Sequence, residues 1–265
     1  MLPPAPPPDP PTTGDLARAD DAPAAAAGYR PERERMLALT EVILCSGVPT
    51  QLVIGHGLAV AGLSPFVDGQ PQAMPLAALA LLDSIVLIGL IIALLRAHGE
   101  SVTALLVGQR PVAREVALGL LLVPVLFVGV GVLVLTLRAL FPWTHNVPVN
   151  PFEQLMRTPM DAALFTVVVI VAGGLREEIQ RVFLLHRFEV HLGGPIFGLI
   201  VISVGFGLGH LVQGLDAAIV TGMLGYAWGA LYLRRRSAVA PIVSHAGYNT
   251  LQILQVMVLR RLGVP

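Results

Sequence analysis

The feature that most constrains this chain is a series of apolar blocks, each long enough to cross a bilayer as a helix, which takes about 20 residues. From Met36 onward the blocks occupy residues 37–63, 75–96, 115–140, 161–186, 195–213, 215–233 and 238–259. The short apolar elements of a soluble fold would not repeat at this length. The sequence therefore predicts an all-α, multi-pass transmembrane helical bundle of about seven spans.

Composition supports a membrane protein and excludes several other classes. Hydrophobic residues make up 55% of the chain and charged residues 13%, against about 45–50% and about 25% in soluble domains. The 17 basic residues equal the 17 acidic ones, so no basic excess favours nucleic acid as a partner. A single cysteine, Cys45, excludes a disulfide framework and a cysteine-based metal site.

Residues 1–35 differ from the rest, because they are rich in Pro and Ala and nearly free of large apolar side chains. Such a segment is expected to be a disordered arm, followed by a membrane domain over residues 36–265. Arginine placement predicts that the N-terminus is cytoplasmic. On that orientation the external segments carry only four of the arginines: Arg138, Arg157, Arg260 and Arg261.

Ionisable side chains inside the expected spans need a reason, since one such charge costs about 2.5–3.5 kcal/mol at the bilayer centre. Glu41 lies near the inner end of its span and is expected to reach the interface. His56 and Asp83 are single polar residues on separate spans, where hydrogen bonding between helices is the simplest expectation.

A cluster of polar residues on the late spans is harder to explain by packing. Glu177 and Arg181 are four apart and are expected to pair on one helix face, while Glu178 points about 100° away. Two further spans repeat the four-residue spacing, which puts Phe206 beside His210 and His245 beside Asn249.

A carboxylate, two imidazoles and an amide can hydrolyse a peptide bond without a covalent intermediate. The carboxylate can accept a proton from water, and His and Asn side chains can hydrogen-bond a developing oxyanion. The same set can instead hold a catalytic Zn²⁺ through His210, His245 and Glu177, leaving one position for water. The sequence leaves the zinc-bound and the metal-free water as alternatives.

These residues resemble the CAAX protease and bacteriocin-processing (CPBP) family of intramembrane endopeptidases, which includes the type II CAAX prenyl endopeptidases. That family carries Glu-Glu-x-x-x-Arg, Phe-x-x-x-His and His-x-x-x-Asn on separate helices. The resemblance covers residues 115–259, the expected catalytic region. One position departs, because Val182 stands where the family has Arg. Arg181 is expected to replace that Arg; the other alignment puts Arg176 in place of the first Glu and loses a carboxylate.

The resemblance implies a role for each matching residue. Glu177 would activate water with help from Glu178, and Asn249 would stabilise the oxyanion. His210 and His245 would bind that water, a metal or the substrate carbonyl, with Phe206 as support for the motif. The implied function is an intramembrane endopeptidase that cleaves a membrane-associated protein or peptide.

Two other functions are weighed against the endopeptidase. The departure at Val182 favours a catalytically silent immunity or interaction protein on the same scaffold. A proton- or metal-coupled transporter would show an inverted repeat, and none is visible in the sequence. Because Lys is absent and Ala, Pro and Arg are frequent, the expected location is a bacterial cytoplasmic membrane.

Overall fold

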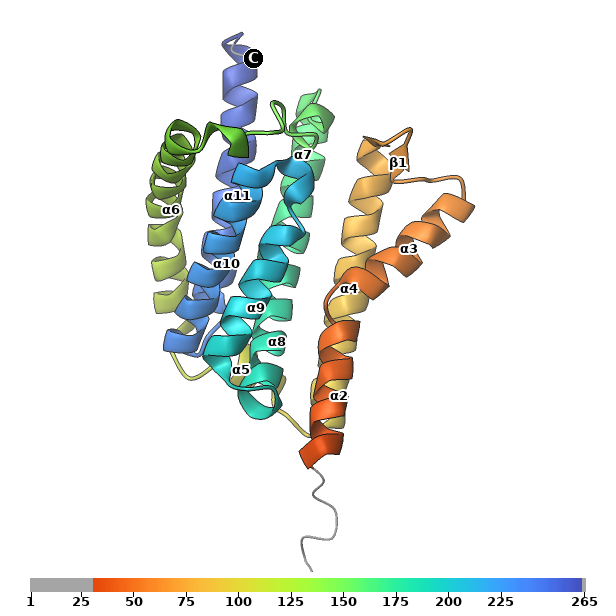
Figure 1. Ribbon diagram of the computed structural model, residues 1–265, viewed down its shortest axis with the longest axis vertical. Helices are drawn as coiled ribbons and strands as arrows, with labels where there is room; N and C mark the ends of the chain where they lie inside the picture. The colour runs from red at the N-terminus through yellow and green to blue at the C-terminus, as the bar shows by residue number, and fades with distance from the viewer. Residues whose placement is uncertain (1–30, 264–265) are drawn as a thin grey trace, which may run out of the picture.

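The computed structural model describes residues 31–263 and confirms the all-α prediction (Figure 1). The helices are α2 (Pro31–Leu44), α3 (Val48–Val60), α4 (Ala73–Ala97), α5 (Val102–Leu106), α6 (Val112–Leu140), α7 (Pro159–Val168), α8 (Glu177–His191), α9 (Pro195–Leu208), α10 (Leu215–Arg235) and α11 (Val239–Arg261). The hairpin of β1 (Phe66–Val67) and β2 (Gln70–Pro71) joins α3 to α4. Four short segments complete the order: η1 (Pro142–Thr144), η2 (Glu153–Leu155), η3 (Val169–Arg176) and η4 (Leu211–Gln213).

The expected N-terminal arm lies mainly outside the described residues, because residues 1–30 are not described. Its boundary at residue 35 is placed too late, since α2 already begins at Pro31. Glu32 and Glu34 lie in the first turn of α2, where negative side chains interact favourably with the helix dipole.

The described chain forms one bundle of α6–α11 with α2–α4 alongside it (Figure 1). Within the bundle, α11 packs against α6 and η3, and α10 packs against α9. The group α2–α4 meets the bundle where α4 contacts η3, α7 and α8, and where α2 contacts α8. The segment α7–η3–α8 therefore lies between the two groups.

Three segments of the described chain are long and apolar enough to span a membrane: Glu32–Val60, Ala73–Ala97 and Val112–Leu140. The other four expected spans coincide with α7–η3–α8, α9–η4, α10 and α11. Of these, α9 has only 14 residues, and α10 and α11 are less apolar than α4 and α6. That the chain has seven membrane spans stays a prediction.

The first expected span, residues 37–63, is not one continuous helix. The α-helix stops at Leu44 and restarts at Val48, with Gly47 at φ 86°. A positive φ favours glycine because it has no Cβ, and the following Pro49 fits the first turn of the new helix. The sequence analysis missed this break, and α3 leaves the direction of α2 there (Figure 1).

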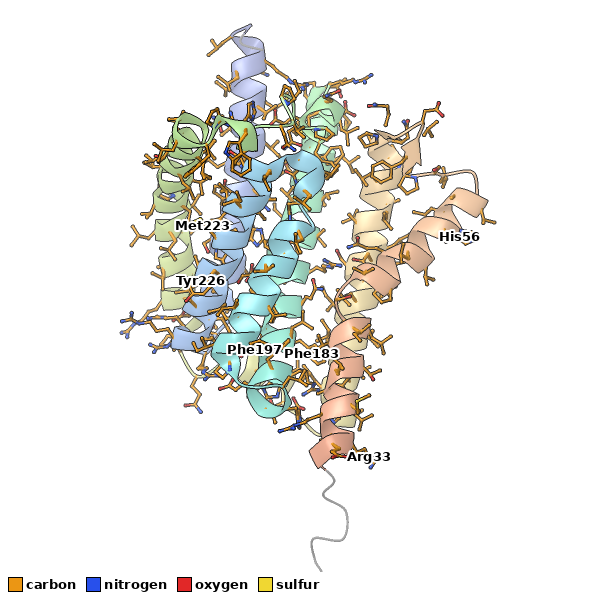
Figure 2. The ribbon with its side chains drawn as sticks, viewed as in Figure 1. Arg33, His56, Phe183, Phe197, Met223 and Tyr226 are labelled. Carbon is orange, nitrogen blue, oxygen red and sulfur yellow. The ribbon has the colours of Figure 1, made fainter. Side chains whose placement is uncertain are left out.

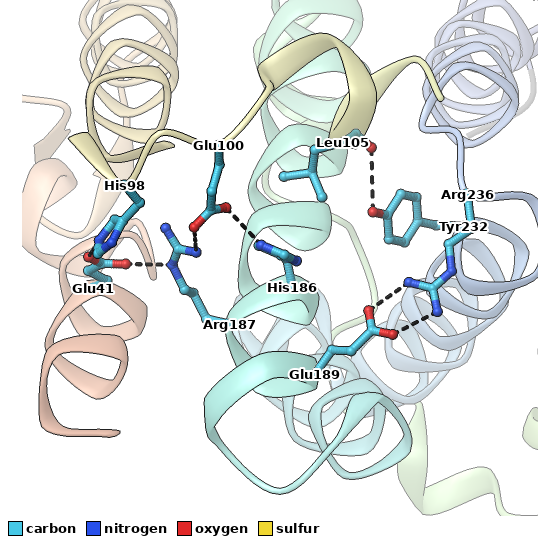
Figure 3. Close-up of polar contacts among 9 residues, drawn as sticks. All are labelled: Glu41, His98, Glu100, Leu105, His186, Arg187, Glu189, Tyr232 and Arg236. Atoms are coloured by element: carbon cyan, nitrogen blue, oxygen red, sulfur yellow. Dashed lines mark hydrogen bonds and ion pairs between the residues drawn. The ribbon is translucent and has the colours of Figure 1, made fainter. Parts of the chain in front are cut away.

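Glu41 is buried in a charged cluster at one end of α8 (Figure 3). Its carboxylate accepts from Arg187 Nε at 2.5 Å and lies 2.6 Å from His98 Nε2. Arg187 also donates to Glu100 at 2.6 Å, and Glu100 lies 2.7 Å from His186. Burial is tolerated because each charge meets an opposite one.

Candidate active site

The structure brings the expected site residues together from α8, α9 and α11. Five of them line one cavity of about 460 Å³ between α6, η3, α10 and α11: Glu177, Phe206, His210, His245 and Asn249. Glu178 and Arg181 lie behind this wall, each nearly inaccessible to solvent. His56, labelled in Figure 2, lies on α3 at the edge of the molecule and lines neither this cavity nor the second one described below.

A stretch of π-helix, η3, leads directly into Glu177. Such stretches are rare and often mark functional sites. Two glycines let α11 approach its backbone: a Cβ on Gly173 would lie 2.6 Å from Asn249 Nδ2, and one on Gly174 would lie 2.5 Å from the Ala246 Cβ. The small residues therefore place the Asn249 amide against the turn that precedes Glu177.

The buried carboxylate Glu178 has two cationic or donor partners. Its Oε1 accepts from Arg181 Nη1 and lies 2.7 Å from His245 Nδ1. The expected pairing of Arg181 with Glu177 is therefore wrong; Arg181 pairs at a spacing of three with Glu178. The Glu178 carboxylate, paired with Arg181, can accept a hydrogen bond from a protonated His245 Nδ1. This leaves His245 Nε2 as the ring nitrogen without a proton.

Glu177 is the more exposed of the two carboxylates and faces the cavity. Its Oε2 lies 3.8 Å from His245 Nε2, which is too long for a direct hydrogen bond. At such a separation one water molecule can bridge two polar groups. The pair can therefore hold a water between a base and a second acceptor.

His210 lies where α9 ends, and its Nδ1 is 2.8 Å from the Phe206 carbonyl oxygen. That contact makes Nδ1 the protonated nitrogen and leaves Nε2 for another partner. The Phe206 ring lies near both imidazoles, with its centroid 4.9 Å from that of His210 and 6.2 Å from that of His245. The Arg181 guanidinium covers the same ring at 4.5 Å.

Trp228 is a site residue that the sequence analysis missed. Its ring stacks on His245 with centroids 3.8 Å apart and an interplanar angle of 16°. Its Nε1 donates to Ser244 Oγ at 3.1 Å, so both neighbours hold the indole in place. In the sequence, nothing separates this Trp from one that merely fills a helix contact.

Asp83 forms hydrogen bonds between helices as expected, with Thr50 and Gln51 of α3. It also pairs with Arg176, the residue directly before Glu177. Arg176 thus pairs with α4, while Glu177 and Glu178 point toward His245. This geometry matches the alignment that keeps both carboxylates.

A second cavity, of about 390 Å³, lies between α2–α3 on one side and α8–α9 on the other. Glu177, Phe206 and His210 line this cavity as well as the first. Much of its remaining wall is apolar, including Val42, Leu184 and Ile202. The candidate site is thus reached from two sides.

The expected zinc ligands do not form a ready metal site. Within residues 31–263, no three His, Cys, Asp or Glu side chains are grouped closely enough to share one ion. Glu177 and His245 are close, but His210 does not complete a set with them.

Comparison with known proteins identifies part of the chain. Residues 159–251 match the family model described as "Type II CAAX prenyl endopeptidase Rce1-like". No curated protein and no solved structure matches the chain significantly. The matched segment begins at the first residue of α7 and ends within α11, so it contains every expected site residue, whereas α2–α6 lie outside it.

The matched family is one of membrane-embedded proteases, and the long apolar helices of the chain agree with it. The wider catalytic region expected over residues 115–259 stays a prediction. Residues 159–251 of this integral membrane protein therefore form an Rce1-like domain, as the resemblance to the CAAX protease and bacteriocin-processing family predicted.

Proposed function

We propose that the protein is an intramembrane endopeptidase that hydrolyses a peptide bond of a membrane-associated protein or peptide, with Glu177 as the general base. The observation that carries the proposal is the 3.8 Å separation of Glu177 Oε2 and His245 Nε2 at a cavity wall. The family match adds the chemical class, because type II CAAX prenyl endopeptidases cleave peptide bonds.

The mechanism starts with a water bound between Glu177 and His245. Glu177 takes one proton from the water as the water oxygen attacks the carbonyl carbon of the scissile bond. The same proton then passes to the amide nitrogen as the C–N bond breaks, which releases an amine and a carboxylic acid and leaves Glu177 as a carboxylate. His245 orients the water through Nε2, since its Nδ1 is bound to Glu178, which Arg181 holds in turn.

The tetrahedral intermediate carries an oxyanion, which needs donors in a site shielded from water. The Asn249 amide, placed against Gly173, supplies N–H donors at the cavity wall. His210 can donate from Nε2 when its ring is protonated, because Nδ1 is already directed at the Phe206 carbonyl. Phe206 lies near both imidazoles and shields the site.

The test compares two carboxylates of one helix. Detergent-purified protein would be given quenched fluorescent peptides ending in a prenylated Cys-aliphatic-aliphatic-X sequence, and matched peptides without the lipid. Glu177→Gln should lower kcat about 10²- to 10⁴-fold, the usual share of a general base. Glu189→Gln, on the same helix but paired with Arg236 outside the site, should retain activity.

Cleavage that survives in Glu177→Gln would refute the role of this carboxylate. A wild-type protein that cleaves neither peptide, although folded, would favour the silent immunity or interaction protein. That alternative rests on Val182 in place of the family Arg. It loses support because Arg181 already forms the buried pair with Glu178.

We also propose a metal-free water, since His210 does not complete a ligand set with Glu177 and His245. Elemental analysis of the purified protein should find well under one zinc per chain. About one zinc per chain, lost in a His210→Ala, His245→Ala double variant, would instead support the His210, His245 and Glu177 ligand set of a metalloprotease.

The proposed location is a bacterial cytoplasmic membrane with the N-terminus in the cytoplasm. The arginine distribution supports this orientation, since all but four of the 17 basic residues fall in segments expected on the same side of the membrane as the N-terminus. A cysteine placed in the N-terminal arm should react with a membrane-impermeant reagent only after cells are opened.

A further inference from the structure

In the described part of the chain, one of two sets of polar residues that join α2–α4 to the α7–η3–α8 segment lies at the break between α2 and α3. Arg176, at the end of η3, donates to the Asp83 carboxylate of α4. Asp83 also accepts from Thr50 Oγ1 and, at 3.4 Å, from Gln51 Nε2, both on α3. The side chains of Arg176 and Asp83 are only 7% and 3% exposed.

The break itself is shaped around this contact. A Cβ on Gly47 would overlap the Arg176 guanidinium, so glycine leaves the space that Arg176 fills. Gln180 of α8, four residues after Arg176, donates to the Cys45 carbonyl at 2.7 Å. That bond satisfies a backbone acceptor next to the break, which inside a bilayer would otherwise be left without water.

The direction of Glu177 depends on how the helix is held at this point. η3 is eight residues of π-helix, and Arg176 is its last residue. Because successive helical residues point about 100° apart, a change of register at this junction would turn Glu177 away from His245. Stretches of π-helix are uncommon, so a neighbouring contact is needed to keep this register.

We propose that Asp83, from outside the family-matched segment, is a positioning residue that holds Glu177 opposite His245 by fixing Arg176. The inference rests on the proposed peptidase function. Asp83 lines neither cavity and so does not touch a substrate in them, whereas Arg176 lines the smaller one. The α2–α4 unit would thus complete a site whose other residues all lie within residues 159–251.

A matched control exists at the other end of α8. Glu41 of α2 accepts from the buried Arg187, which also donates to Glu100 (Figure 3). In the same manner, Asp83 accepts from the buried Arg176. Both pairs join α2–α4 to the bundle, but only Asp83 acts next to Glu177. Glu41→Gln therefore loosens the same interface without touching the register of the catalytic turn.

The first experiment measures kcat and KM for Asp83→Ala, Asp83→Asn and Glu41→Gln with the fluorescent peptides, at equal folded fraction. Misplacing a catalytic group by about 1 Å can cost about 10²-fold. We expect a loss of that order in kcat for Asp83→Ala, with KM changed by less than about twofold. Glu41→Gln should keep the wild-type kcat. The double variant Asp83→Asn, Arg176→Gln should recover part of the loss, since it leaves no unpaired charge.

The second experiment needs no substrate. Hydrogen–deuterium exchange should rise in peptides covering residues 169–177 for Asp83→Ala and stay unchanged there for Glu41→Gln. Equal loss of kcat in both variants, or unchanged exchange at residues 169–177 in Asp83→Ala, would overturn the inference. If the wild type cleaves no peptide, the proposed function fails and the exchange result alone decides the role of Asp83.

Discussion

The buried pair of Glu178 and Arg181 offers a prediction that separates stability from activity. The two side chains are only 1% and 2% exposed. Arg181→Met leaves a carboxylate in a site without water, and breaking a buried pair in this way costs about 3–5 kcal/mol. We expect the free energy of unfolding to fall by about that amount.

The double variant Glu178→Leu, Arg181→Met should behave differently. Replacing both members of a buried pair by apolar residues is often neutral or stabilising, by about 1–4 kcal/mol. In the part of the chain that the structure describes, Glu178 Oε2 and Arg181 Nε have no hydrogen-bond partner, so this pair is incompletely satisfied. The variant does lose the contact of Arg181 with Phe206, worth about 2 kcal/mol when desolvated. Its stability should therefore return to within about 2 kcal/mol of the wild type.

Activity should not return with stability, because His245 Nδ1 loses its carboxylate partner in the double variant. Unfolding would be followed by titration with sodium dodecyl sulfate in mixed micelles, and cleavage with the fluorescent peptides. A double variant as unstable as Arg181→Met would show that the pair is a net source of stability. A double variant with wild-type activity would show that Glu178 does not position His245.

Four further predictions follow from the surroundings of single residues. Trp228→Phe keeps an aromatic ring against the imidazole that Trp228 stacks on, whereas Trp228→Leu does not; the Leu variant should lose more kcat, by about 0.5–1.5 kcal/mol of transition-state free energy. Gly174→Val should lower the thermal unfolding temperature, because a Cβ there would lie 2.5 Å from a side-chain carbon of α11, and such overpacking costs about 1–3 kcal/mol. Gly129→Ala meets nothing within 4 Å and should stabilise the helix by up to about 1 kcal/mol. The hydrogen bonds from Arg236 lower the pKa of Glu189, so this carboxylate stabilises the fold above the ordinary pKa of about 4.3 and the effect is lost as pH falls through the lowered value. Glu189→Gln should remove that part of the acid limb in thermal unfolding scans, and an unchanged acid limb would contradict the assignment.

The expected helical faces agree with the site in part. The four-residue spacing correctly placed Phe206 beside His210, because the Nδ1 of His210 contacts the carbonyl oxygen of Phe206. It also placed His245 and Asn249 on one face, and both line the same cavity. The same rule failed for Arg181, because spacings of three and four are both available on a helix and the packing against α11 selected Glu178.

Long-range partners were the main omission. Asp83 and Arg176 are 93 positions apart, and Glu41 and Arg187 are 146 apart. Each acid alone looked like a packing residue or an interfacial one. The cost of a buried charge shows that a partner must exist, but it does not say which of the 17 basic residues that partner is.

The sequence by itself determined the helical class and the membrane setting, and it predicted five residues that line the larger cavity. The bilayer sets the length of an apolar block, and the helix repeat sets which side chains share a face. The tertiary structure alone decided which carboxylate faces the cavity, where α2 ends, and that Asp83 binds the residue before Glu177. These features depend on how separate helices pack, because a buried charge takes the opposite charge that packing brings within reach.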